Sequence, residues 1–223
     1  MISIEAYKEN PCKALSIPYW KAKRISIPSN MRIMHDSDFD KRQPEYDVDK
    51  RYFRLIHHLS NIPEFEEAGI GLEVISFDRS AELVDMINRS YTHSEIRVSE
   101  DFVKSWTDTE VYCPELWIGA VSGRNLIGSI ICDFDREVGE AIIEWLQVLP
   151  EYRCRGIASA LLSRALKTMR SFADFVTVSG ECDNVTNPES VYRRCGFEGN
   201  DVWHVMTCIR GEKNNAIWDA DVN

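Results

Sequence analysis

The chain has 223 residues, of which 44% are hydrophobic and six are tryptophan. This composition can bury a substantial core, so it excludes a disordered chain and predicts one domain, or one domain with a sizeable elaboration. The formal net charge of −10 argues against a general nucleic-acid-binding protein, which would present a basic face.

The first seventy residues form an irregular stretch with prolines at positions 11, 18, 28, 44 and 63. Two pieces within it, 31–39 and 52–59, resemble strands. We expect them to pair antiparallel across the charged, proline-containing stretch between them, with a helix as the alternative for 52–59. Several aromatic side chains in this region predict that it packs as an extension on the rest of the chain.

The pattern becomes regular from residue 71 onward. Alternation over 71–77 predicts a strand, and Ser80 is the predicted N-cap of the helix that follows. The apolar residues that recur at helical spacing in this helix are Leu83, Ile87 and Tyr91. Ser99 opens a second helix, with two acidic residues in the first turn, where the helix dipole favours them.

The remaining elements alternate between strands and helices. They are strands at 116–122, 126–135 and 140–148, a helix from Ile157, a strand at 174–181, a short helix at 188–195 and a strand at 202–209. The first two strands join as a hairpin around Gly123. The predicted buried stripe of the long helix consists of Leu161, Ala165, Met169 and Phe172. The order predicts a mixed α/β layer, and 211–223 reads as a loose tail.

The seven cysteines are scattered, and none forms a C-x-x-C pair. They therefore suggest neither a zinc site nor a redox motif. Free thiols in a chain of this size are typical of a reducing compartment. The N-terminal residues lack the apolar run of a secretory signal, and no apolar stretch approaches membrane-spanning length. We therefore expect a cytoplasmic protein without a membrane or nucleic-acid partner.

The stretch LPEYRCRGIASALLSRAL, residues 149–166, runs from the end of a strand into a helix. A helix start offers backbone N–H groups without intrahelical partners, and these bind phosphate well. Gly156 and Ala158 would let oxygens approach the backbone, and Arg153 and Arg155 add charge. Neither a P-loop nor a Rossmann motif is present. The alternative is a helix start that carries surface arginines.

Two segments in order resemble one family. Arg153-x-x-Gly156-x-Ala158 fits the Q/R-x-x-G-x-G/A signature of the GNAT family, the GCN5-related N-acetyltransferases, and 191–198 resembles its LY-x-x-x-GFE segment. The resemblance spans 71–210. It implies a mixed, mostly antiparallel central sheet flanked by helices. The predicted organisation is an extension at 1–70 packing on the core, a GNAT domain at 71–210 and a tail at 211–223.

The resemblance also implies acetyl-CoA as the acetyl donor, without a metal. The family splays the strand holding Glu144 from the strand holding Val178, and acetyl-CoA lies in that cleft. Relatives commonly carry an asparagine where this chain has Val185. Asn184 and Asn187 flank that position, so the contacting asparagine stays open, with Asn187 as the candidate. The implied acetyl-CoA-binding residues are Leu146, Gln147 and Val148 for the pantetheine arm and Arg153, Cys154, Arg155, Gly156, Ile157, Ala158 and Ser159 for the pyrophosphate.

Acetyl transfer to an amine needs a proton acceptor and a proton donor. Glu144 is the candidate acceptor, because a charged residue within an apolar strand is costly unless it has a partner or a task. Because side chains alternate between the two faces of a strand, we expect Glu144 to point to the same face as Leu146 and Val148. The alternatives are an outward-facing glutamate or a structural ion pair, and Glu140 and water-mediated schemes compete for the role.

Tyr192 is the candidate donor, because the family often places a tyrosine there near the thioester sulfur; the alternative is a packing residue. His204 is expected to pack rather than to reach the substrate. Cys154 is expected to be a spectator, since the family transfers the acetyl group directly.

The sequence favours a small-molecule amine acceptor over a protein, because an added N-terminal layer over the cleft would narrow it. The extension would then cover the acceptor side, or else build a dimer interface, so both a monomer and a homodimer are compatible. Aminoglycoside-like polycations would suit the acidic composition. The competing functions are a non-catalytic acyl-CoA-binding or sensing module of GNAT fold and an unrelated α/β nucleotide binder.

Overall fold

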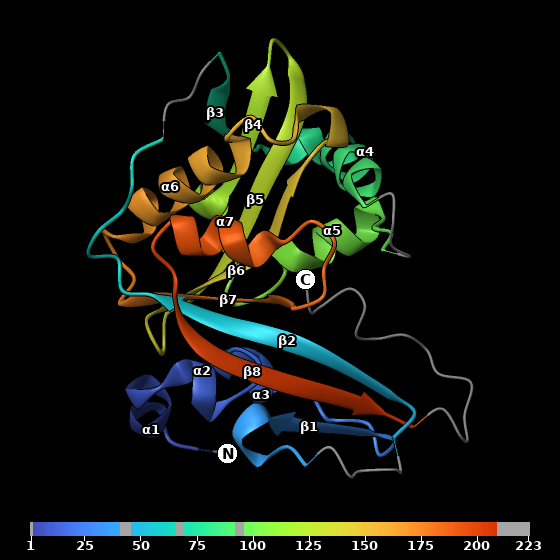
Figure 1. Ribbon diagram of the computed structural model, residues 1–223. Helices are drawn as coiled ribbons and strands as arrows, with labels where there is room; N and C mark the ends of the chain where they lie inside the picture. The colour runs from blue at the N-terminus through green and yellow to red at the C-terminus, as the bar shows by residue number, and fades with distance from the viewer. Residues whose placement is uncertain (1, 41–45, 66–68, 92–95, 209–223) are drawn as a thin grey trace.

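The computed structural model describes residues 2–40, 46–65, 69–91 and 96–208. Eight strands form one sheet in the order β1-β8-β2-β7-β6-β5-β4-β3 (Figure 1). Neighbouring strands in the described residues are antiparallel except β6 and β7, which are parallel. The strands are β1 (Met31–His35), β2 (Val48–His57), β3 (Gly71–Val74), β4 (Trp117–Ser122), β5 (Asn125–Asp135), β6 (Glu140–Val148), β7 (Phe175–Glu181) and β8 (Glu198–Thr207).

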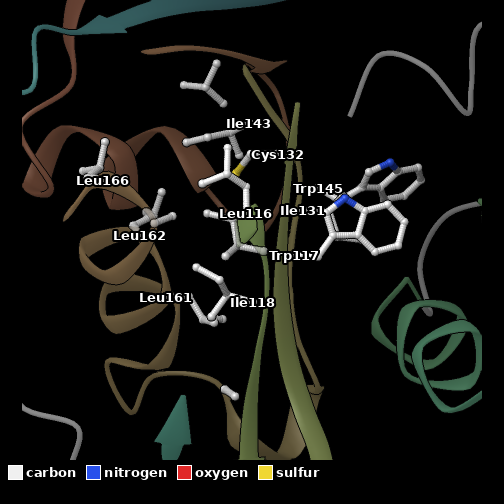
Figure 2. Close-up of a cluster of buried hydrophobic side chains, with 14 of the residues drawn as sticks. Leu116, Trp117, Ile118, Ile131, Cys132, Ile143, Trp145, Leu161, Leu162 and Leu166 are labelled. Atoms are coloured by element: carbon white, nitrogen blue, oxygen red, sulfur yellow. The ribbon is translucent and has the colours of Figure 1, made fainter. Parts of the chain in front are cut away.

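Helices cover both faces of this sheet (Figure 1). Figure 2 shows α6 on one face, opposite the side on which Trp117 and Trp145 lie. The helices are α1 (Ile4–Glu9), α2 (Pro11–Ala14), α3 (Tyr19–Ala22), α4 (Ser80–Ser90), α5 (Glu100–Thr107), α6 (Ile157–Met169) and α7 (Pro188–Arg194). None of the helices in these described ranges is long and apolar enough to cross a membrane. The mixed, mostly antiparallel sheet with flanking helices is the fold class predicted from the sequence.

The main core lies between α6 and the sheet. Leu161 and Leu166 of α6 are fully buried, and burying a leucine side chain contributes roughly 1.5–3 kcal/mol. The buried side chains that Figure 2 labels in this layer are Leu116, Ile118, Cys132, Ile143, Leu161, Leu162 and Leu166. The periodicity of α6 therefore identified its core face correctly, except at Phe172. That residue lies beyond the end of the helix and is 38% exposed.

The two strands of the first seventy residues do not pair with each other, contrary to our expectation. β8 lies between them and pairs antiparallel with both β1 and β2, and β2 also pairs with β7. The piece at 52–59 is a strand rather than a helix. Strand patterns specify which side chains share a face but not which strand lies alongside, so the sequence could not reveal this order.

Strands β1 and β2 thus belong to the same sheet as the strands of the predicted GNAT domain. The domain boundary at residue 70 stays a prediction, and the predicted tail at 211–223 lies outside the described residues. The N-cap of α4 also differs from our expectation. A short 3-10 helix, Phe77–Arg79, precedes α4, so Ser80 is its first residue and Arg79 takes the cap position.

A buried polar cluster ties α1 to the middle of the sheet. The Glu140 carboxylate accepts hydrogen bonds from the Tyr7 hydroxyl at 2.8 Å, from Arg54 at 3.2 Å and from Thr177 at 2.5 Å. Arg54 and Glu140 are almost completely buried. Burial raises the pKa of Glu140, and Arg54 and the two hydroxyl donors oppose that shift. These three donors hold Glu140 in a buried polar cluster, and its competing role as proton acceptor stays a prediction.

Replacing Arg54 with Met should lower the free energy of unfolding by about 3–5 kcal/mol, because it leaves the Glu140 carboxylate buried without its cation. Denaturant unfolding measures this change. Arg51→Met is the matched control on the same strand. Arg51 pairs with Asp183 at the surface, and such a pair contributes at most about 1 kcal/mol. Equal losses in the two variants would contradict a structural role for the buried cluster.

Candidate functional site

The parallel strands β6 and β7 separate partway along their length. Their register runs from Glu140 opposite Phe175 to Ile143 opposite Val178 and ends there. The rest of β6, including Leu146 to Val148, stays paired with β5 on its other side. This opening between the strands is the splay that the family resemblance implied. It leaves one edge of β6 without a β7 partner next to the predicted pantetheine residues.

Glu144 lies at the point where the two strands part. Ile131 of β5 is opposite Trp145 and Cys132 is opposite Ile143, so Glu144 is the extra residue of a β-bulge. As a consequence Ile143 and Trp145 point to opposite faces of the sheet, as Figure 2 shows. The parity that we assigned to Glu144 from strict alternation is therefore wrong, because the bulge interrupts the alternation at this residue.

The Glu144 carboxylate is nearly buried and has one ionic partner. Its Oε2 accepts a hydrogen bond from Lys21 Nζ at 2.6 Å, and the two side chains are only 13% and 8% exposed. Its Oε1 is buried and has no hydrogen-bond partner among the described residues. Oε2 is therefore engaged in the ion pair with Lys21, whereas Oε1 can still accept a hydrogen bond.

Glu144 lines a cavity of about 260 Å³ between the sheet and the N-terminal segment. Strands β1, β2, β7, β8 and β6 provide one wall, and residues 16–18 with Lys21 provide the other. Ile143 and Ser179, which border the opening between β6 and β7, also line it. The extension therefore covers one side of the splay, as one of our two interpretations of this region required.

Tyr192 is buried on α7, where its ring contacts Phe53 and Phe197. Burial raises the pKa of its hydroxyl well above the ordinary value, so the hydroxyl stays protonated and able to donate at neutral pH. Tyr192 belongs to the main hydrophobic core together with Ile143 of β6, and its role as proton donor stays a prediction.

The predicted phosphate cradle has the backbone geometry of an anion site. Gly156 is the N-cap of the thirteen-residue helix α6, has φ +80° and leaves the first turn without a side-chain cap. Cys154 also has a positive φ, of 60°, and its side chain is exposed. A small hollow of about 130 Å³ borders Gly156, Ile157 and Arg155. A Cβ at Gly156 would meet no atom within 4 Å, so the approach to these N–H groups is open.

The remaining predicted binding residues differ in their contacts. Arg153 donates to the carbonyls of Val148 at 3.1 Å and Ser90 at 2.6 Å, so it holds the turn in place. Arg155 is exposed and lies over the Tyr152 ring, 5.2 Å from its centroid. Arg155 is therefore the better placed of the two to add charge to the hollow.

Ser159 and Asn187 were predicted to lie near acetyl-CoA. Ser159 is buried beside Cys195, where burial raises the pKa of the thiol to about 11 and Ser159 opposes that shift. Asn187 is the N-cap of α7 in a left-handed conformation, and its side chain makes no cap hydrogen bond. Ser159 therefore joins α6 to α7, whereas the Asn187 side chain is not used to cap its own helix.

His204 and Lys21 were not among the predicted site residues. His204 is buried, stacks on Phe39 and contacts Asp36 and Asp49, so it packs as expected. Lys21 was missed, because one lysine in an irregular segment carries no signal of a partner 123 residues away. No cluster of three metal-ligating side chains occurs in the ranges that the structure describes.

Replacing Gly156 with Asp should weaken acetyl-CoA binding by about ten- to one-hundredfold, as expected when charge-assisted hydrogen bonds worth about 1.5–3 kcal/mol are lost. Calorimetric titration with acetyl-CoA measures the change. Gly156→Asn is the matched control, because asparagine has the same shape and tolerates positive φ but adds no charge. Unchanged affinity in Gly156→Asp would exclude the cradle as the phosphate site.

A mixed sheet that opens between two parallel strands, beside a helix with an uncapped N-terminus, defines the class of the protein as an α/β fold of GNAT type. The model of the Acetyltransferase (GNAT) family matches residues 81–197, just over half of the chain. The chain therefore belongs to this family.

Known proteins agree with this assignment. An acetyltransferase of Yersinia pestis is 34% identical over 76 residues, which are 31% of this chain and 52% of the relative. The N-alpha-acetyltransferase MAK3 of Arabidopsis thaliana is 36% identical over 87 residues, 38% of this chain and 45% of the relative. A GCN5-related N-acetyltransferase from Sphaerobacter thermophilus shares the fold with a TM-score of 0.61 at 20% identity, covering 72% of this chain and 52% of that one. The matches span about half the length of these proteins.

Proposed function

We propose that the protein is an N-acetyltransferase that passes the acetyl group of acetyl-CoA directly to the primary amine of a small molecule. The observation that carries this proposal is Glu144. Its unpartnered Oε1 is buried at the point where β6 and β7 separate, and the residue lines a cavity on the acceptor side. Membership of the GNAT family supports acetyl-CoA as the donor.

The residues at the splay can supply both proton transfers. Glu144 takes a proton from the acceptor ammonium, because only the free amine has a lone pair to attack the thioester carbonyl carbon. The new C–N bond forms, the C–S bond breaks, and Tyr192 provides a proton to the leaving CoA thiolate. The second proton that the nitrogen loses on acylation reprotonates Tyr192 through solvent. Glu144 releases its proton to solvent, so that each turnover of an ammonium releases one proton.

The fit of the chain to acetyl-CoA rests on three features. The first turn of α6 presents uncapped N–H groups for the pyrophosphate. The β6 edge at 146–148 has no β7 partner and can pair with the pantetheine amides. Cys154 lies in the cradle, away from the cavity that Glu144 lines, which supports direct transfer without an acyl-cysteine.

A small acceptor is favoured by the enclosure of the cavity. Ser16, Ile17, Pro18 and Lys21 cover the strands that form its other wall. A polypeptide acceptor would need an open groove at this place, whereas a small molecule needs only enough volume for its own body.

Thiol release from acetyl-CoA in the presence of a broad panel of primary amines tests the proposal, with calorimetric titration of acetyl-CoA on the same protein. We expect acetyl-CoA to bind and thiol to appear with at least one small amine. Tight binding of acetyl-CoA without turnover on any amine would instead support the alternative, a non-catalytic acyl-CoA-binding or sensing module.

A further inference from the structure

The cavity beside Glu144 has mostly apolar walls. Strands β1, β2 and β8 contribute Ile33, Val48 and Val205, and the N-terminal segment contributes Ile17 and Pro18. Trp203 also lines it and donates its indole N–H to the Cys12 carbonyl at 2.8 Å. A ligand therefore meets hydrocarbon and ring surface over most of its body.

The charged groups along the cavity are unevenly distributed. Of the described residues that line it, Glu144 is the one carboxylate, whereas Lys21, Lys50 and Arg54 are cations. Lys21 already binds Glu144 Oε2, and Arg54 binds Glu140. The place that suits an incoming ammonium is therefore Glu144 Oε1, which is buried and without a partner.

A second ammonium on the same ligand would weaken binding in this cavity. It would either lose its water against apolar walls, where an unpaired charge is strongly destabilised, or lie close to one of three cations. A single ammonium at Glu144 Oε1 shares that carboxylate with Lys21 and carries no second charge into the apolar part of the cavity. The cavity volume of about 260 Å³ suits a compact apolar body.

We propose that the acceptor is a primary monoamine on an aliphatic or aromatic body of about this size, with its ammonium at Glu144 Oε1 and its body against the Val205 and Ile17 side of the cavity. This inference rests on the proposed acetyl transfer and defines its substrate class. It also excludes the aminoglycoside-like polycations that the acidic composition alone would permit.

Steady-state thiol release by the full chain at saturating acetyl-CoA tests the inference with a matched pair, hexylamine and 1,6-diaminohexane, which differ by one ammonium. Phenethylamine, spermidine and kanamycin extend the comparison. We expect kcat/KM for hexylamine and phenethylamine to exceed that for the diamine, spermidine and kanamycin at least about tenfold, since burying one unpaired charge costs more than the 1.4 kcal/mol that tenfold represents.

The outcomes separate the two proposals. Turnover of spermidine or kanamycin at a kcat/KM equal to or above that of hexylamine would overturn the monoamine inference and leave the acetyltransferase intact. Turnover of peptide amines alone would overturn the monoamine inference and the small-molecule acceptor of the proposed function, but not acetyl transfer itself. Tight binding of acetyl-CoA with no thiol release from any amine would overturn the proposed function and this inference with it.

A substitution in the apolar wall of the cavity tests the proposal independently. Val205→Asp places a carboxylate in the apolar wall, so it should reduce kcat/KM for hexylamine at least about tenfold and narrow its advantage over the diamine. Val202→Asp is the matched control, because Val202 is on the same strand and does not line the cavity. Thermal unfolding of both variants verifies that they fold. An unchanged ratio of hexylamine to diamine in folded Val205→Asp would contradict the assignment of this wall.

Discussion

Replacing Glu144 with Gln is expected to lower kcat by about 10²–10⁴-fold, the range for loss of a general base. The affinity for acetyl-CoA should be nearly unchanged, because the phosphate cradle on α6 is a separate part of the structure. Thiol release measures the first quantity and calorimetric titration the second. Full activity of the variant would remove Glu144 from the mechanism.

The same substitution removes the carboxylate that pairs with the buried Lys21 ammonium, so it should also lower the free energy of unfolding, because breaking a buried ion pair is destabilising. The double variant with Lys21→Met and Glu144→Gln removes both charges and should recover most of that stability but none of the activity. An activity loss caused merely by unfolding would be reversed in the double variant, so the two explanations give opposite results.

The pair formed by Lys23 and Glu137 provides a matched comparison. Its lysine belongs to the same N-terminal segment as Lys21 and lies 2.5 Å from the carboxylate, but the two side chains are 38% and 52% exposed. Lys23→Met should therefore change stability by at most about 1 kcal/mol and leave turnover near that of the unaltered protein.

Replacing Tyr192 with Phe should also lower kcat by about 10²–10⁴-fold, since the leaving thiolate loses its proton donor. Phe retains the ring that packs against Phe53 and Phe197, so the affinity for acetyl-CoA and the fold should persist. Thiol release and calorimetric titration again measure the two effects.

Tyr112→Phe serves as the control for the loss of a tyrosine hydroxyl. Tyr112 packs edge-on against Trp117, which points to the face of the sheet opposite α6 in Figure 2. The Tyr112→Phe variant should retain normal turnover. If Tyr192→Phe also retains it, the tyrosine is a packing residue, and solvent must provide the proton.

Most secondary-structure elements and the cradle were predictable because their signals are local. The period of α6, the hairpin at Gly123 and the cap at Ser99, which accepts from the Phe102 N–H at 3.2 Å, each depend on residues close together in the chain. Gly156 is a similar case, because a left-handed turn that opens a helix favours a residue without a Cβ strain penalty. The same segments carry the family resemblance, so the fold class followed from them.

The acceptor side of the site was not predictable in this way. The bulge at Glu144 depends on the register between β5 and β6. A single extra residue on one strand changes the pattern of apolar residues too little for the bulge to be recognised from the sequence. Strict alternation therefore assigned the wrong parity to Glu144. The predicted pairing of β1 with β2 was wrong for a related reason. The pattern of each strand is compatible with pairing to the other or to β8, so it does not decide between these partners.

The sequence by itself thus determined the strands, the helices from residue 80 onward, the turn that opens α6 and the family, because contiguous residues encode periodicity, capping and backbone conformation. Only the tertiary structure decided that Lys21 pairs with Glu144, that one carboxylate oxygen remains unpartnered, and that the N-terminal segment closes an apolar cavity over the splayed strands. These contacts join residues more than a hundred positions apart. Their formation depends on how whole elements pack to bury apolar surface, and no local pattern records that outcome.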